Sequence, residues 1–231
     1  MKKLIRIHFR YFIDKFSIIL ISSLFIISVI FFLILGLTLP EMNFVDSYSS
    51  LSLSIIKFIS VLFSINIFTF SGLPKNDSYA NIWVTSKIER SKYIITKLTV
   101  YSLIVISFII VMFLSFIIMG IISNEYFNFS DYKSVLIVSI TAIYYGVIAN
   151  ILVKILPNYL ISFVTIILFL FGDFLANLIS TESVLLDLYS VIFPIISNVN
   201  NELYLKSGLT IIIVFPVVIM SMYHLYMIKD L

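Results

Sequence analysis

The stretch Leu98–Ile122, LTVYSLIVISFIIVMFLSFIIMGII, decides the fold because none of its 25 residues carries a charge. A helix of that length rises about 37 Å, which exceeds the hydrocarbon core of a bilayer, about 30 Å thick. A long apolar run without alternation suits a helix in lipid, because the helix satisfies its own backbone hydrogen bonds there. We therefore expect this segment to span a membrane.

Five further runs have similar length and apolarity. The composition agrees with them, since 61% of residues are hydrophobic and 12% charged, against about 45–50% and about 25% in soluble domains. The sequence therefore predicts an all-α integral membrane protein, a single domain over 1–231 with six transmembrane helices. Besides Leu98–Ile122, the expected spans are Phe16–Leu39, Leu51–Phe70, Ser134–Val153, Tyr159–Ile179 and Leu209–Met227.

Lysine and arginine in the loops set the expected orientation. Twelve lie on the side that holds both termini, and the loops on the opposite side hold only Lys133 and Lys206. Loops rich in Lys and Arg stay in the cytoplasm. We therefore expect both termini in the cytoplasm. The Ile-, Lys- and Asn-rich composition hints at an AT-rich bacterium, whose cytoplasmic membrane would hold the chain. The twelve are Lys2, Lys3, Arg6, Arg10, Lys15, Lys75, Lys87, Arg90, Lys92, Lys97, Lys154 and Lys229.

Two regions outside the spans have patterns of their own. In residues 1–15, apolar and charged side chains fall on opposite faces of a helix, which predicts an interfacial helix before span one. The alternative is a simple positively charged flank. Within the outer region 180–208, the apolar run Val184–Ile196 is too short to span, so we expect a re-entrant or interfacial segment before span six.

Residues 71–97 form the one sizeable loop expected in the cytoplasm. Tyr79, Ile82 and Trp83 follow the helix-start residues 76–78 at i, i+3, i+4 spacing, which predicts a short amphipathic helix. The alternative is that Trp83 only anchors the chain at the membrane interface. The run Ser86-Lys87-Ile88-Glu89 matches a capping box and predicts a helix start that continues into span three.

Two ionisable residues fall well inside the spans. Lys57 and Asp173 have similar predicted depth, in the outer third of the membrane, and each costs roughly 2.5–3.5 kcal/mol there if unpaired. We expect both to face protein or water, beside the pathway or a dimer interface. The polar Asn66 and Asn177 are assigned to the same region, but for them and for Asn150 the default explanation is a helix–helix hydrogen bond. The alternatives are that Lys57 reaches the outer headgroups and that Asp173 caps its own loop.

The motifs of several enzyme classes are missing from the sequence. It has no Gly-rich phosphate loop, so we expect no ATP hydrolysis by this chain. His8 and His224 lack the spacing of a zinc motif, and the chain has no cysteine. Neither a catalytic residue, a metal site nor a nucleic-acid partner is expected.

The layout resembles the membrane subunits of type 2 ATP-binding-cassette (ABC) exporters. In that family a Pro-[IV]-[ST]-Arg motif precedes span three, and a Lys enters it. Arg90 and Lys97 match this pattern, whereas Lys87 replaces Pro and Glu89 replaces Ser or Thr. The closing Ile228-Lys229-Asp230-Leu231 is similar to the basic–Asp ending of the family.

The resemblance implies a half-transporter. Two permeases, identical or related, would pair through their first, second and fifth spans. Each would dock a cytoplasmic ABC ATPase, which carries the ATP and Mg, through the N-terminal helix and a coupling helix. The residues it assigns to that coupling are Tyr79, Ile82, Trp83, Lys87, Glu89 and Arg90.

Two other functions stay open. A substrate-capturing membrane subunit of a vitamin-uptake system also has six helices without an ATPase motif, but would not need the amphipathic loop. A membrane-embedded enzyme or channel is disfavoured by the missing motifs. An aromatic and aliphatic pathway with short outer loops favours hydrophobic or amphipathic cargo, such as antimicrobial peptides or lipophilic drugs, expelled from the surrounding membrane lipid.

Overall fold

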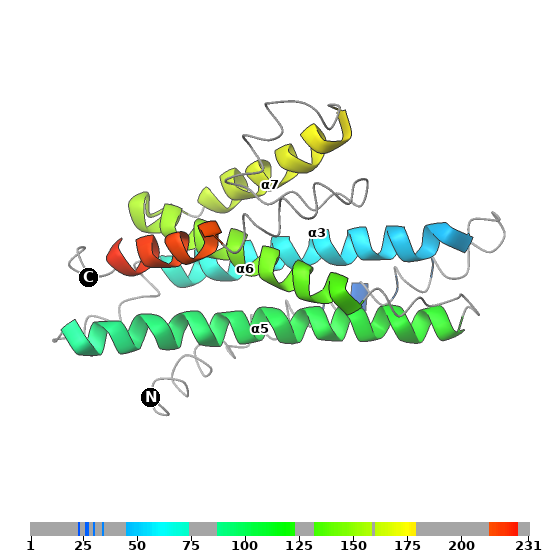
Figure 1. The fold of residues 1–231 in the computed structure, drawn as a ribbon, viewed down its shortest axis with the longest axis horizontal. Helices are drawn as coiled ribbons and strands as arrows, with labels where there is room; N and C mark the ends of the chain where they lie inside the picture. Colours follow the sequence, from blue (N-terminus) through cyan, green and yellow to red (C-terminus); the bar gives the residue numbers. More distant parts are fainter. Residues whose placement is uncertain are drawn as a thin grey trace. The chain divides into compact units, whose positions relative to one another are not determined.

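The computed structural model describes residues 23, 26, 27, 30, 34, 45–73, 87–122, 132–158, 160–178 and 213–225. Regular structure in this part is helical throughout (Figure 1). Three segments are long and apolar enough to cross a membrane, namely Ile55–Gly72, Ser91–Ile118 and Val138–Ile155. The prediction of a helical membrane protein is confirmed at this level. The helices are α3 (Val45–Gly72), α5 (Lys87–Ile122), α6 (Tyr132–Ile155), α7 (Ile161–Leu178) and a C-terminal helix, Ile213–Leu225.

The helices coincide with predicted spans two to six. Helices α3, α5 and α6 contain all or nearly all of spans two, three and four, and α7 covers most of span five. Of the described helices, only α3, α5 and α6 contain a segment long and apolar enough to cross a membrane, and Ile213–Leu225 is a shorter apolar helix. Five residues of span one are described, all helical, so the count of six spans stays a prediction. The expected helix over 1–15, the short helix around Trp83 and the outer region 180–208 lie outside the described residues.

Two of the helices end for the same local reason. Helix α3 ends at Gly72 and α6 ends at Ile155, two residues before Pro74 and Pro157 in the sequence. Proline has no N–H to donate, and its ring disfavours helical geometry in the residue before it. The chain therefore leaves the helix near each proline.

Only Lys154–Asn158, which includes Pro157, separates predicted spans four and five, so the sequence predicts a tight helical hairpin there, and α6 and α7 form one. The chain reverses direction between them (Figure 1) within residues 156–160. The Asn158 side-chain oxygen accepts a hydrogen bond from the Leu160 N–H (3.0 Å), and the Asn158 carbonyl accepts one from Ile161 (3.2 Å). An asparagine that binds the first free N–H groups is a favourable N-cap, so Asn158 fixes the start of α7.

Helix α5 is one continuous helix of 36 residues beginning at Lys87, as the capping-box pattern predicts. One face buries Val105, Ile109 and Met112, and the opposite face exposes Leu103, Ile110, Leu114, Ile118 and Ile121. An exposed apolar stripe of this length is what lipid requires of a span. The packed side and the lipid side are thus separated along the whole apolar part of α5.

The chain divides into two compact units. The first comprises Met1–Ser60 and Ile95–Ser139, and the second comprises Val61–Ile94 and Ile140–Leu231. The second unit holds the end of α3, most of α6, all of α7 and the C-terminal helix. The contacts that define the candidate site all lie inside this second unit.

Candidate functional site

Helices α3 and α6 approach closely at Gly146. An ideal Cβ added there would lie 2.5 Å from the Ser64 Oγ and 2.5 Å from the Phe68 Cδ2. Real Cβ atoms do not come so near other atoms, so the absence of a side chain is what permits this contact. Small residues allow membrane helices to pack at short range, where van der Waals contact replaces the missing hydrophobic driving force.

A second glycine repeats the arrangement at the end of α3. A Cβ at Gly72 would come within 3.0 Å of Val153 Cγ1 and of Asn150 Nδ2. Residue numbers rise together along the two helices, from Ser64 beside Gly146 to Gly72 beside Val153. Helices α3 and α6 therefore run parallel here, the direction that the predicted order requires of spans two and four.

Asn150 joins the two helices by hydrogen bonds. Its Nδ2 donates to the Phe68 carbonyl oxygen (2.8 Å) and to the Ser71 hydroxyl oxygen (3.1 Å). The Ser71 hydroxyl in turn donates to the same Phe68 carbonyl (2.8 Å). Asn150 is fully buried, with 0% of its surface exposed. Both amide hydrogens of one buried side chain thus bind the last two turns of α3.

These donors suit the electrostatics of the end of α3. The last turn of a helix carries the negative end of its dipole and carbonyl groups without partners in the helix. The last turn of α3 contains no basic residue, so the favourable partial charges come from the Asn150 amide and the Ser71 hydroxyl. In hydrocarbon, no water replaces such donors.

Six other hydroxyl groups in the described helices bond within their own helix. Each donates to the carbonyl four residues earlier, the usual way a hydroxyl is satisfied in a membrane span. The network around Asn150 differs because its bonds link residues 79 and 82 positions apart. The six are Thr99, Ser107, Ser115, Ser139, Thr165 and Ser221.

A third group of hydroxyls is buried without such a bond. Within the described part of the chain, these oxygens have no hydrogen-bond partner. Ser64, one of them, faces Gly146, and Thr141 lies one turn before Tyr144 and Tyr145 on α6. Desolvating a hydroxyl without a partner is unfavourable. The group consists of Ser60, Ser64, Thr69, Ser102 and Thr141.

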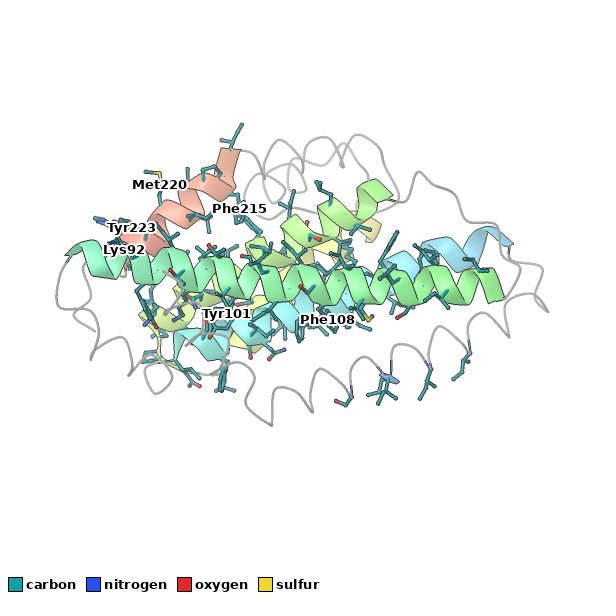
Figure 2. All side chains as sticks on the ribbon, turned by 90° about the horizontal axis from the view of Figure 1, so that it is seen from below. Lys92, Tyr101, Phe108, Phe215, Met220 and Tyr223 are labelled. Carbon is teal, nitrogen blue, oxygen red and sulfur yellow. The ribbon has the colours of Figure 1, made fainter. Side chains whose placement is uncertain are left out.

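The opposite face of α6 packs through aromatic rings. Tyr145 meets Phe169 of α7 edge-on, with centroids 5.1 Å apart, and Tyr144 meets Phe215 of the C-terminal helix at 5.8 Å. Phe215 and Met220 leave the C-terminal helix on different sides (Figure 2), and Met220 is 71% exposed. One side of this helix therefore packs on α6 while another lacks protein cover.

Of the residues proposed for the pathway, Lys57 and Asn66 are described with their side chains. Lys57 is buried, with 8% of its surface exposed, whereas a lysine reaching the headgroups would be exposed. Lys97, which enters span three, is 2% exposed. The Asn66 amide donates to the Leu62 carbonyl of its own helix (2.8 Å). The burial of Lys57 favours the expectation that it faces protein.

The remaining predicted residues are placed less completely. Asp173 and Asn177 lie on the last turns of α7, and Lys87, Glu89 and Arg90 lie on the first turn of α5; only their backbone positions are described. Tyr79, Ile82 and Trp83 lie outside the described residues. Their assigned roles, and the proximity of Lys57 to Asp173, stay predictions.

Sequence reasoning missed both glycines of the contact but gave Asn150 the role that the structure shows. Asn150 looks like any polar residue of a span, whose ordinary role is a helix–helix hydrogen bond. A signal was present, because Ala142, Gly146, Ala149 and Val153 repeat small residues along the same face of the helix. The sequence does not say which helix meets that face.

The chain matches no protein-family model, and no curated protein or solved structure shows significant similarity to it. Among the described residues, no group of three His, Asp or Glu side chains is placed to hold a metal ion. The class that the fold defines is therefore a helical membrane protein.

Proposed function

We propose that this chain is the transmembrane subunit of an ATP-driven exporter, resembling the permeases of type 2 ABC transporters. Two copies, or one copy and a related permease, form a pathway in the bacterial cytoplasmic membrane. The pathway expels hydrophobic or amphipathic substrates such as antimicrobial peptides or lipophilic drugs. A separate cytoplasmic ATPase binds ATP and Mg and supplies the energy.

The length of α5 is the observation that carries the proposal. Its 36 residues make a helix about 54 Å long, about 24 Å longer than the hydrocarbon core of a bilayer. Its first turns contain Lys87, Glu89, Arg90 and Lys92, and its last turns are apolar. The excess therefore falls at the charged end, where the helix extends beyond the lipid and offers charged residues to an aqueous partner.

The most direct test isolates the full-length chain with whatever binds it. We expect an ATPase without membrane spans to copurify in detergent, and the pair to move the lipophilic dye rhodamine 6G across vesicle membranes only with ATP. ATP hydrolysis by the isolated chain, after mock-purification controls, would contradict the proposal. Tight vitamin binding without an ATPase would instead support the uptake-subunit alternative.

The coupling residues are tested by substitution of Trp83. Trp83→Ala should weaken ATPase binding by at least about tenfold while the chain still inserts, because a buried Trp at an interface contributes about 2 kcal/mol or more. Phe58→Ala, on an aromatic that is 39% exposed in α3, is the control and should bind the ATPase normally. Unchanged ATPase binding by Trp83→Ala would favour the membrane-anchor interpretation.

The charges proposed for the pathway are tested as a pair. Lys57→Met and Asp173→Asn should each reduce transport, and the double variant should recover part of the loss, because two neutral residues leave no uncompensated charge. Strictly additive losses would show that the two residues do not interact. Normal transport by either single variant would remove that residue from the pathway.

A further inference from the structure

The end of α3 is held more firmly than a lipid-facing span requires. Two glycines bring it against α6, and one buried asparagine binds both a carbonyl and a hydroxyl of its last two turns. The residues that follow α3 in the sequence, 74–86, include Tyr79, Ile82 and Trp83, three of the six assigned above to the ATPase contact. The Asn150 contact therefore lies at the point where that loop leaves α3.

We propose that Asn150 is a positioning residue that makes the end of α3 and the α6–α7 hairpin move as one body, so that displacement of loop 74–86 is passed to α6 and α7. The assignment of segment 74–86 to the ATPase contact rests on the proposed function. The contact of α3 and α6 through Gly72, Asn150 and Val153, here called the joint, does not. Three features at this joint act together: the buried amide of Asn150, the close approach at Gly72 and the short turn through Asn158 that ties α7 to α6.

The arrangement distinguishes this joint from ordinary helix packing. Apolar contacts between membrane helices slide with little penalty, because lipid tails offer similar contacts elsewhere. Asn150 and Ser71 are buried, so an amide that moves off the Phe68 carbonyl and the Ser71 hydroxyl finds no water within the contact to replace them. Sliding of α3 along α6 is therefore disfavoured, and rigid movement of the pair is favoured.

A disulfide across the joint tests this directly. The chain contains no cysteine, so the pair Gly72→Cys and Val153→Cys reports only the introduced bond. A Cβ at residue 72 falls within 3.0 Å of Val153 Cγ1, so the two Cβ atoms lie no more than about 4.5 Å apart, the upper end of the Cβ–Cβ distances in disulfides. The control pair is Phe70→Cys with Ile155→Cys, on exposed faces of the same two helices.

We expect the 72–153 pair to cross-link rapidly in membranes and the control pair not to cross-link within one chain. Adding Asn150→Leu should slow the 72–153 reaction by about fivefold, the order of effect of a hydrogen bond between membrane helices. An unchanged rate would show that Asn150 does not hold the joint. Ser71→Ala, which removes one of the two acceptors, should slow the reaction less.

The functional measurement uses the complex of the chain with its ATPase in vesicles. Asn150→Leu should lower the rhodamine 6G exported per ATP hydrolysed by about fivefold, the same factor as the weakened joint, and oxidation of the 72–153 pair should restore it. Oxidation of that pair with Asn150 intact should leave export nearly unchanged. Loss of export on oxidation, reversed by a reductant, would show that α3 and α6 separate during transport and would overturn the proposal.

Failure of the proposed function would look different. If the wild-type chain and its copurified ATPase export no dye, the exporter assignment is wrong, yet the cross-linking rates with and without Asn150→Leu still decide whether the joint exists. If export occurs but the covalent bond does not rescue Asn150→Leu, the joint is not what couples the loop to α6 and α7.

Discussion

Helix α6 contacts its neighbours through two faces of different chemistry. One face meets α3 through Gly146, Asn150 and Val153, with short distances and hydrogen bonds between helices. The other meets α7 and the C-terminal helix through Tyr145 and Tyr144, with ring centroids more than 5 Å apart. The first face fixes one register, because glycine contacts and amide bonds fit only one alignment. The second fills space and tolerates small shifts.

The two faces of α6 contribute to stability in different ways in a chain surrounded by lipid. Burying an apolar side chain gains little there, so specificity must come from close fit and from polar bonds. The aromatic face contributes dispersion contacts summed over large rings. We therefore expect the two faces to respond to opposite changes: the aromatic face to loss of volume, and the α3 face to gain of volume or loss of polarity.

The largest effect is expected from Tyr145→Ala on the aromatic face. It deletes the ring that meets Phe169 at 5.1 Å and leaves a cavity, which lowers the free energy of unfolding by about 3 kcal/mol or more. Titration with a denaturing detergent, followed by circular dichroism, measures the loss. Ile155→Ala, at a position 52% exposed, is the control. Equal stability of the two variants would mean that the rings do not support α6.

A smaller loss is expected from Gly146→Ala on the α3 face. The added methyl group would meet Ser64 and Phe68 at 2.5 Å, and overpacking of this kind destabilises by about 1–3 kcal/mol. Val111→Ile adds one methylene at an exposed site and should change little in the same detergent titration. Helix propensity alone would make Gly146→Ala stabilising. A gain in stability would therefore contradict the close approach of α3 and α6 at Gly146.

Asn150→Leu should destabilise by about 1–2 kcal/mol, because leucine fills a similar volume but donates no hydrogen bond. Thr165→Val is the matched control, since Thr165 is buried but bonds only within its own helix to the Ile161 carbonyl (3.0 Å). We expect that control to stay within about 0.5 kcal/mol of wild type. Equal losses from both variants would show that the hydrogen bond between helices contributes no more to the free energy of unfolding than a bond within one helix.

The smallest effect concerns Thr141, whose buried hydroxyl has no partner among the described residues. Thr141→Val removes a desolvated polar group and should be neutral or stabilising, by up to about 1 kcal/mol. The unfolding titration again provides the measurement. A loss above about 1 kcal/mol would indicate that a bound water or another group satisfies the hydroxyl.

Much of the described fold is predictable from the sequence, because the free energy of transferring a segment into lipid depends on its own residues and their near neighbours. The apolar runs at 51–70, 98–122 and 134–153 became helices that contain nearly all of them. The five residues from Lys154 to Asn158 predicted a hairpin, and Asn158 caps α7. The capping-box pattern placed the start of α5 at Lys87.

The candidate site was less predictable. Asn66 and Asn150 are both polar residues in apolar spans, and the sequence favoured Asn66 for a pathway role. In the structure Asn66 donates back to Leu62 of its own helix, while Asn150 donates across to α3. The difference depends on the rotation of each helix about its axis, which hydropathy does not encode for a span that is apolar on every face.

The sequence by itself determined that the described part of the chain forms long apolar helices suited to a membrane, and near which residues several of them end; the orientation that its basic loops favour stays a prediction. These properties follow from local chemistry: side-chain transfer energies, proline and asparagine at helix ends, and the sign of loop charges. Only the tertiary structure decided that Gly72 of α3 meets α6, and that Gly146 and Asn150 of α6 meet α3. That contact requires two helices distant in sequence to share one alignment, and packing in three dimensions selects it.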